Sequence, residues 1–180
     1  TNYTVEGDCS QAAFFAVANE LGSNIEIAGV NRNSVQGDRA VFDIIDKAIK
    51  INGTYSGFDV DASDIPDLVP ILTVLASFAE GTSHIRGCRR LRLKESDRLV
   101  TISTVLNSLG GKVAIVDGDE LEIQGVKELS GGVCSSFNDH RIAMSLAVAS
   151  QKCTSPLTIT GAECVAKSYP TFFEDFRQLG

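Results

Sequence analysis

The chain repeats one pattern three times, and no other feature of its 180 residues restricts the possible folds as strongly. Each copy opens with a polar pair, continues as an apolar stretch with helical spacing, breaks, and closes on a short alternating stretch typical of a strand. The copies are GDCSQAAFFAVANELGSNIEIAG (7–29), PDLVPILTVLASFAEGTSHIRGC (66–88) and DHRIAMSLAVASQKCTSPLTITG (139–161). The pattern predicts three related units.

A second block follows each copy at a constant distance. The blocks are SVQGDRAV (34–41), LKESDRLV (93–100) and AKSYPTFF (166–173). The same offset of 27 residues leads into them, counted from Asp8 to Val35, from Asp67 to Lys94 and from His140 to Lys167. Chance alone rarely keeps one register across three copies, so the units are expected to share one architecture.

Each unit is predicted to run strand, helix, strand, helix, which places the chain in the α/β (α+β) class. The first two units are expected to end in a hairpin. In the second unit this hairpin is KVAIV and ELEIQG, joined at Asp117 and Gly118, a favoured turn pair. In the first unit it is expected within TYSGFDVDAS (54–63). The third unit stops at Gly180 before any closing strands, so we expect it either to be degenerate or to be completed by another piece of polypeptide.

Charge and cysteine content narrow the class of protein. A formal charge of −7 argues against nucleic acid or an anionic membrane as the main partner, because both favour a basic surface. The longest apolar run, 68–79, is too short to span a bilayer. No N-terminal stretch is typical of a secretion signal, and no zinc spacing occurs. We therefore expect a cytoplasmic protein without a structural metal. Buried, reduced thiols are the favoured interpretation of the five cysteines, with a nucleophilic thiol as the alternative.

Charged residues gather where helices are predicted to start. In LRLKESDRLVTISTVLNSLGG (91–111) a strand is expected to end at Lys94 and a helix to follow a cap at Ser96 or Asp97. Cations at a helix N-terminus oppose the macrodipole, and an anionic ligand would offset that cost. A shared phosphate or carboxylate site is therefore predicted. The cations expected around it are Lys94, Arg98, Arg141 and Lys167, and Asp67, Glu95 and His140 lie at the same predicted helix starts.

Each of these residues also has an ordinary structural interpretation. Arg98 can pair with Asp97 or Asp67, and surface ion pairs of that kind contribute little. A glutamate in a first turn complements the dipole, and an aspartate before a helix is often a plain cap. Arg39, the repeat counterpart of Arg98, is predicted to be structural. The case for function depends on the coincidence of the whole set.

Five segments together resemble the 5-enolpyruvylshikimate-3-phosphate synthase family over nearly the whole chain, 5–180. They are VEGDCSQAAFF (5–15), DIPDLVPILTVLASFAEGT (64–82), LKESDR (93–98), NDHRIAM (138–144) and AKSYPTFFEDF (166–176). The resemblance implies an inside-out α/β barrel of βαβαββ units, with helices inside and sheets outside. It also implies a C-terminal part of a two-domain enzyme. The expected domain is 1–180, with units of about 1–63, 64–135 and an incomplete 136–180.

The resemblance implies an activity as well. Such enzymes transfer the enolpyruvyl group of phosphoenolpyruvate to the 5-hydroxyl of shikimate 3-phosphate, through addition and elimination, without metal or organic cofactor. By position, Asp67 matches the proton acceptor and Glu95 the residue that moves a proton at the methylene carbon. Lys94 matches a ligand of shikimate 3-phosphate. The other matches are Arg98, Arg141 and Lys167, which hold phosphoenolpyruvate, and His140, which lines the pocket.

Departures from the family pattern limit what the chain is expected to do alone. Some members place an asparagine where this sequence has Arg90, and the substrate ligands of the other domain are missing. We expect the isolated chain to fold at least partly and to turn over no substrate. Alternative interpretations are a UDP-N-acetylglucosamine enolpyruvyl transferase, a nucleotide cyclase on the same repeat, and a non-catalytic phosphate-binding or assembly module.

Overall fold

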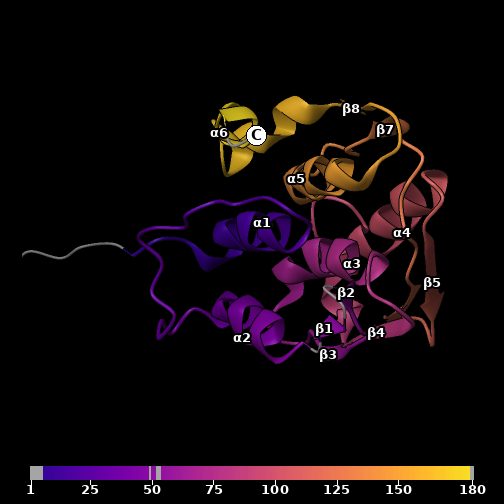
Figure 1. Cartoon of the computed structure of the whole chain (residues 1–180), viewed down its shortest axis with the longest axis horizontal. Helices are drawn as coiled ribbons and strands as arrows, with labels where there is room; N and C mark the ends of the chain where they lie inside the picture. Colours follow the sequence, from indigo (N-terminus) through magenta and orange to yellow (C-terminus); the bar gives the residue numbers. More distant parts are fainter. Residues whose placement is uncertain (1–5, 49, 52–53, 179–180) are drawn as a thin grey trace, which may run out of the picture.

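The computed structural model describes residues 6–48, 50–51 and 54–178 (Figure 1). The α-helices are α1 (Cys9–Glu20), α2 (Ala40–Lys47), α3 (Val69–Ser77), α4 (Arg98–Ser108), α5 (His140–Ala149) and α6 (Phe172–Gln178). The strands are β1 (Lys50–Ile51), β2 (Thr54–Tyr55), β3 (Asp59–Asp61), β4 (Thr82–Arg86), β5 (Lys112–Val116), β6 (Glu120–Gln124), β7 (Gly132–Ser135) and β8 (Leu157–Thr160). Short 3-10 helices are η1 (Gly37–Arg39), η2 (Pro66–Leu68), η3 (Cys88–Leu93), η4 (Ser150–Lys152) and η5 (Ala162–Lys167).

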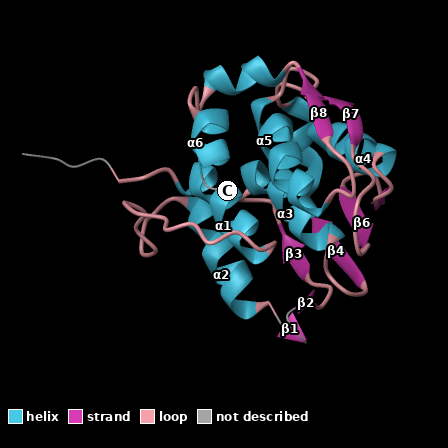
Figure 2. Ribbon diagram, turned by 45° about the horizontal axis from the view of Figure 1, so that its top comes forward, coloured by secondary structure: helices cyan, strands magenta, loops and turns pink. Residues whose placement is uncertain are grey.

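The first helix of each repeat lies in the core. Every residue of α3 and of α5 is buried, and most of α1 is buried as well. A helix that is apolar on all sides belongs in an interior. Helices α1, α3 and α5 lie side by side in the middle of the molecule, and the strands lie on its periphery (Figure 2). The predicted arrangement of helices inside and sheets outside is therefore confirmed.

The second unit forms a complete sheet with the order β3-β4-β6-β5. Strands β3 and β4 are parallel because α3 connects them, whereas β4, β6 and β5 are antiparallel. The predicted hairpin joins β5 to β6, and Asp117 and Gly118 both adopt positive φ, as such a tight turn requires. Ile85, Leu121 and Ile123 are fully buried and turn one face of this sheet toward the helices.

Two predictions for the first unit are wrong. Its hairpin is β1 with β2, one step earlier than expected, because 59–61 pairs with β4 instead. The stretch 25–28 alternates in burial like a strand but is not one among the described residues, since no described strand lies beside it. Asn19 bonds both the N–H and the carbonyl of Ile25. The strand expected before α1 would lie in 1–5, outside the described residues.

The predicted strand before Lys94 is also wrong, because 88–93 is the 3-10 helix η3. A 3-10 helix has three residues per turn, so Cys88 and Leu91 share a face, and both are fully buried. Leu93, two positions after Leu91, is 88% exposed. The alternation of leucine and arginine in this short stretch fits a period of three as well as a period of two.

The predicted helix starts are confirmed in the block 93–100 and at the start of the third copy, 139–161. Asp97 caps α4 by accepting a hydrogen bond from the N–H of Val100, and Asp139 caps α5 through Arg141. The third block differs, because α6 begins only at Phe172 and Lys167 ends η5. The residue before a proline avoids helical backbone, which delays the start of α6 past Pro170.

The cysteines are all free thiols in the structure, and only Cys153 is more than marginally exposed. Burial raises the pKa of the Cys88 thiol to about 12, so it stays protonated. Four of the five cysteines are buried, as expected from the sequence. In the described part of the chain, no helix combines the length and apolar character that crossing a membrane requires.

Candidate active site

The starts of α3, α4 and α5 meet, and six of the seven predicted site residues lie there in one network of ion pairs. Asp67 comes from η2, directly before α3. Lys94 and Glu95 lie in the link from η3 to α4, and Arg98 is the first residue of α4. His140 and Arg141 open α5. Repeat symmetry places these segments together because each belongs to the same end of its unit.

Arg98 is the centre of the network and is only 1% exposed. Its Nη1 donates to Asp67 Oδ1 at 2.8 Å, its Nη2 to Glu95 Oε2 at 2.5 Å, and its Nε to Asp139 Oδ2 at 2.8 Å. A buried guanidinium needs such partners to offset its lost hydration. Of the two partners considered for Arg98 from sequence, Asp67 is therefore right and Asp97 is wrong, because Asp97 pairs with Arg92.

Asp67 lies among three cations. Lys94 Nζ is 3.0 Å from Asp67 Oδ1, and Arg141 Nη2 is 3.6 Å from Asp67 Oδ2, in addition to the bond from Arg98. Burial by itself raises the pKa of this carboxyl, but the charges of Arg141, Lys94 and Arg98 together outweigh burial and lower it. Asp67 is therefore ionised at neutral pH and able to accept a proton or a hydrogen bond.

Asp139 is a member of the network that sequence reasoning identified only as part of a helix start. It is fully buried, and it accepts hydrogen bonds from Arg98 Nε, from Ser96 Oγ at 3.0 Å and from the N–H of Arg141 at 3.0 Å. Burial raises its pKa, but the bond and charge of Arg98 lead the contributions that lower it overall. The sequence contained a signal for this role, because Asp139 directly precedes two predicted site residues, His140 and Arg141.

His140 and Glu95 lie next to each other at the edge of the network. His140 Nδ1 is buried, lies 3.7 Å from Glu95 Oε1, and has no hydrogen-bond partner among the described residues. Burial, followed by the charge of Arg141, lowers the pKa of His140, so the ring is neutral at pH 7. A neutral imidazole with an unused ring nitrogen can exchange a hydrogen bond with a bound molecule.

A metal ion is a poor match for this group of side chains. Glu95, Asp139 and His140 offer ligand atoms within 4.8 Å of one another. However, Arg98 already bonds both carboxylates, and a cation placed there would be repelled by that guanidinium and by Arg141. The arrangement instead favours a ligand that can replace a carboxylate on an arginine, which is an anion.

Lys167 lies beside the network but does not join it. Its Nζ donates to the carbonyl of Asn138 at 2.7 Å, just before the Asp139 cap. That carbonyl is presented by a turn in which Phe137 and Asn138 both have positive φ, 53° and 57°, which is uncommon for residues other than glycine. The charged end of Lys167 is therefore held next to the start of α5 and remains exposed.

The first unit contributes differently from the other two. Arg39 pairs with Asp43 on the surface at 3.0 Å, which confirms its structural interpretation. The neighbouring Asp38 was not singled out from sequence, yet it lies within electrostatic range of the network. Burial and then the charge of Asp67 raise its pKa, while Arg141 opposes them. The sequence contained a signal for Asp38, because the triplet GDR (37–39) corresponds in the repeat to SDR (96–98) of the second unit.

The carboxylates in the network already offset the cost of cations at helix starts. Lys94, Arg98 and Arg141 lie against Asp67, Glu95 and Asp139. The dipole argument therefore does not by itself require an anion. What the structure adds is a set of donors from separate repeats that converge on one point.

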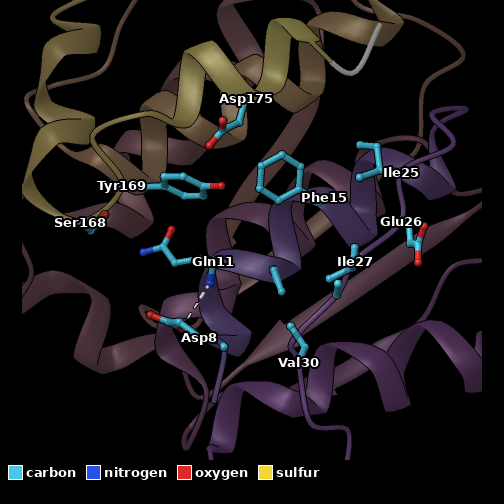
Figure 3. A pocket seen from close by; sticks show the side chains of 13 residues that line it. Asp8, Gln11, Phe15, Ile25, Glu26, Ile27, Val30, Ser168, Tyr169 and Asp175 are labelled. Atoms are coloured by element: carbon cyan, nitrogen blue, oxygen red, sulfur yellow. Dashed lines mark hydrogen bonds between the residues drawn. The ribbon is translucent and has the colours of Figure 1, made fainter. Parts of the chain in front are cut away.

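A cleft of about 480 Å³ lies between the start of α1, the stretch 25–30 and the stretch 168–175. Phe15 and Tyr169 line it, together with Asp8, Gln11 and Asp175 (Figure 3). None of the four cations predicted for the site lines this cleft.

Comparison with known proteins gives a consistent result. The family model described as EPSP synthase (3-phosphoshikimate 1-carboxyvinyltransferase) matches residues 1–176. A 3-phosphoshikimate 1-carboxyvinyltransferase of Clostridium acetobutylicum is 47% identical over 190 residues, covering 100% of this chain and 44% of the relative. One from Clostridium kluyveri is 48% identical over 187 residues, covering 98% of the chain and 44% of the relative.

Solved structures agree. An EPSP synthase from Acinetobacter baumannii superimposes with a TM-score of 0.85 at 28% identity, covering 98% of this chain and 46% of that one. An enolpyruvyl transferase from Streptomyces tendae gives 0.70 at 17% identity, covering 99% and 44%, which supports the fold alone. The chain thus spans less than half the length of the relatives it matches. From residue 1 to residue 176, it belongs to the EPSP synthase family.

Proposed function

We propose that this chain is the part of an enolpyruvyl transferase that holds phosphoenolpyruvate and supplies the proton-transfer groups. The whole protein would transfer the enolpyruvyl group to the 5-hydroxyl of shikimate 3-phosphate and release inorganic phosphate. The observation that carries this proposal is the ion-pair network at the starts of α3, α4 and α5, built from the residues that match the family motifs.

Substrate binding is proposed to work by exchange of carboxylates. Each side-chain nitrogen of Arg98 already donates to a carboxylate, and the anionic groups of phosphoenolpyruvate would replace one or two of these carboxylates. Glu95 is the partner most easily displaced because it is the most exposed, at 37%. Charge-assisted bonds from Arg98 and Arg141 would then hold the substrate, with Lys167 leaving the Asn138 carbonyl to join them.

The exchange would also free the two acidic groups for chemistry. The neighbouring cations keep Asp67 ionised. Asp67 would take the proton of the 5-hydroxyl of shikimate 3-phosphate while the oxygen of that hydroxyl bonds to the enol carbon of phosphoenolpyruvate. Once released from Arg98, Glu95 would take up a proton from solvent, deliver it to the methylene carbon, and take one back when the phosphate leaves with the proton held by Asp67. Neutral His140, 3.7 Å from Glu95, is placed to orient that carboxyl.

The domain organisation belongs to the same proposal. We infer one domain of three units, about 1–63, 64–135 and 136–180, that works with a second part of the protein in the cytoplasm. The sheets of the second and third units support this division. In each unit the opening strand pairs in parallel with the next strand along the chain, β3 with β4 and β7 with β8.

A chimera tests the proposed activity. In it, the matching segment of the Clostridium acetobutylicum relative is replaced by residues 1–180. Phosphate release from phosphoenolpyruvate is expected only when shikimate 3-phosphate is also present. Glu95→Gln should lower kcat by about 10²-fold or more, in the range for a lost acid or base. Arg39→Gln, which breaks a surface pair, is the control and should leave kcat unchanged. A fully active Glu95→Gln chimera would contradict the proposed role.

A further inference from the structure

The side chain of Arg141 is held in place by the first repeat. Arg141 is 7% exposed, and its shortest side-chain hydrogen bond runs from Nη2 to Ser10 Oγ at 2.9 Å. Its other contacts are longer, 3.4 Å from Nη1 to the Asp67 carbonyl and 3.6 Å from Nη2 to Asp67 Oδ2. Ser10 precedes Arg141 by 131 positions and is itself buried.

The direction of these bonds is fixed by chemistry. A guanidinium can only donate, so the Ser10 oxygen accepts from Arg141 and its proton must go elsewhere. Asp8 Oδ1 lies 2.7 Å from Ser10 Oγ and can only accept. The same oxygen accepts from the N–H of Ser10 at 2.8 Å, as the cap of α1. Asp8 therefore orients the hydroxyl so that its free lone pairs face Arg141.

We propose that Ser10 is a positioning residue for Arg141, with Asp8 setting the orientation of its hydroxyl. This inference rests on the proposed function, in which Arg141 holds phosphoenolpyruvate. Without the serine, the nearest remaining acceptors of Arg141 are both on Asp67. The guanidinium would then turn toward Asp67 and occupy the carboxylate that is needed as proton acceptor. Ser10 keeps the two groups apart and available to the substrate.

Kinetics of the chimera give the first test. Ser10→Ala should raise KM for phosphoenolpyruvate by about tenfold, the order expected for one lost bond to a charged group. KM for shikimate 3-phosphate should stay within about twofold, since its proposed ligand Lys94 does not contact Ser10. Ser10→Thr keeps the hydroxyl and should restore most of the loss. Ser77→Ala is the matched control, because Ser77 is a buried helical serine whose hydroxyl donates to the Thr73 carbonyl of its own helix.

Equal increases in both KM values, no increase in either, or the same change in Ser77→Ala would overturn the proposal. A second measurement keeps the test independent of activity. In the isolated chain, carbon NMR of the Asp67 carboxyl should show a changed chemical shift in Ser10→Ala but not in Ser77→Ala, because the Arg141 guanidinium turns toward Asp67 only when Ser10 is lost. An unchanged Asp67 signal in Ser10→Ala would refute the positioning role. An inactive chimera with the expected NMR difference would refute the proposed function alone.

Discussion

At the scale of single residues, Arg98 and Asp139 form the buried centre of the site. Arg98 is 1% exposed and Asp139 is fully buried, and each has further hydrogen-bond partners besides the other. Such a pair contributes little net stability compared with an apolar pair, but removing one partner leaves an uncompensated charge. The rigidity of the site therefore depends strongly on either residue.

Substitution of Asp139 is expected to be costly. Asp139→Ala leaves Arg98 Nε without its acceptor and removes the cap of α5, so the free energy of unfolding should fall by about 3 kcal/mol. Asp43→Ala breaks an exposed aspartate–arginine pair and should cost less than about 0.5 kcal/mol. Urea denaturation of the isolated chain measures both values. Equal losses would mean that the buried pair has no special role.

His140 predicts a pH dependence of stability. Burial, and then the charge of Arg141, lowers its pKa in the folded chain below the unfolded value of about 6.5. As the pH falls below 6.5, the unfolded chain binds the proton first, so stability is lost on acidification until the folded pKa is passed. The variant His140→Gln should lack this decline, and His84→Gln should keep it. Urea titrations between pH 7.5 and about 5 compare the three proteins.

Parallel pH profiles for the wild type and His140→Gln would contradict this prediction, because they would show that the ring gains its proton as easily in the folded chain as in the unfolded chain.

The helix caps at this scale were predictable, because Asp97 and Asp139 precede apolar helical stretches in the sequence. The bond between Asp139 and Arg98 was not predictable, because it joins residues 41 positions apart. It depends on how α4 packs against α5, which no local pattern specifies.

At the scale of elements, the link from β4 to α4 shows where periodicity misleads. Leu91 and Leu93 would share a face in a strand, whereas the 3-10 helix η3 buries one and exposes the other. A stretch of three alternating residues cannot distinguish the two periods. The segment 25–28 fails for another reason, because a strand needs a neighbour and the described residues provide none there. Pairing of that kind is not local.

The two leucines of η3 provide a direct test. Leu91→Ala should lower the free energy of unfolding by about 2–5 kcal/mol, because it empties a fully buried position. Leu93→Ala should change it by less than about 0.5 kcal/mol, because that side chain already faces solvent. Thermal or urea unfolding of the two single variants gives the comparison. Similar losses at both positions would support a strand in solution.

At the scale of the whole molecule, the repeat organisation was the most predictable feature. The apolar helices of the three units, 9–20, 69–77 and 140–149, were visible in the sequence and form the core. Their packing brings the starts of neighbouring units together and thereby creates the network. What the repeat could not show is that the first unit contributes through Ser10 rather than through a cation.

The isolated chain is expected to fold without catalysing the reaction. Urea should unfold it in one cooperative transition, because α1, α3 and α5 pack against one another in a single hydrophobic core. Phosphate release from phosphoenolpyruvate and shikimate 3-phosphate should stay at background, because the chain spans only 44% of the length of the Clostridium acetobutylicum relative. Turnover well above background by the purified 180-residue chain would contradict this expectation.

The three carboxylates around Arg98 affect how a ligand approaches the site. The opposite charges in the network nearly cancel beyond a few ångströms, and the chain as a whole carries −7. The network therefore exerts no long-range electrostatic attraction on a distant anion. Encounter would be governed by plain diffusion, with weak dependence on ionic strength, and discrimination would begin only once the incoming group competes at contact distance for the guanidinium.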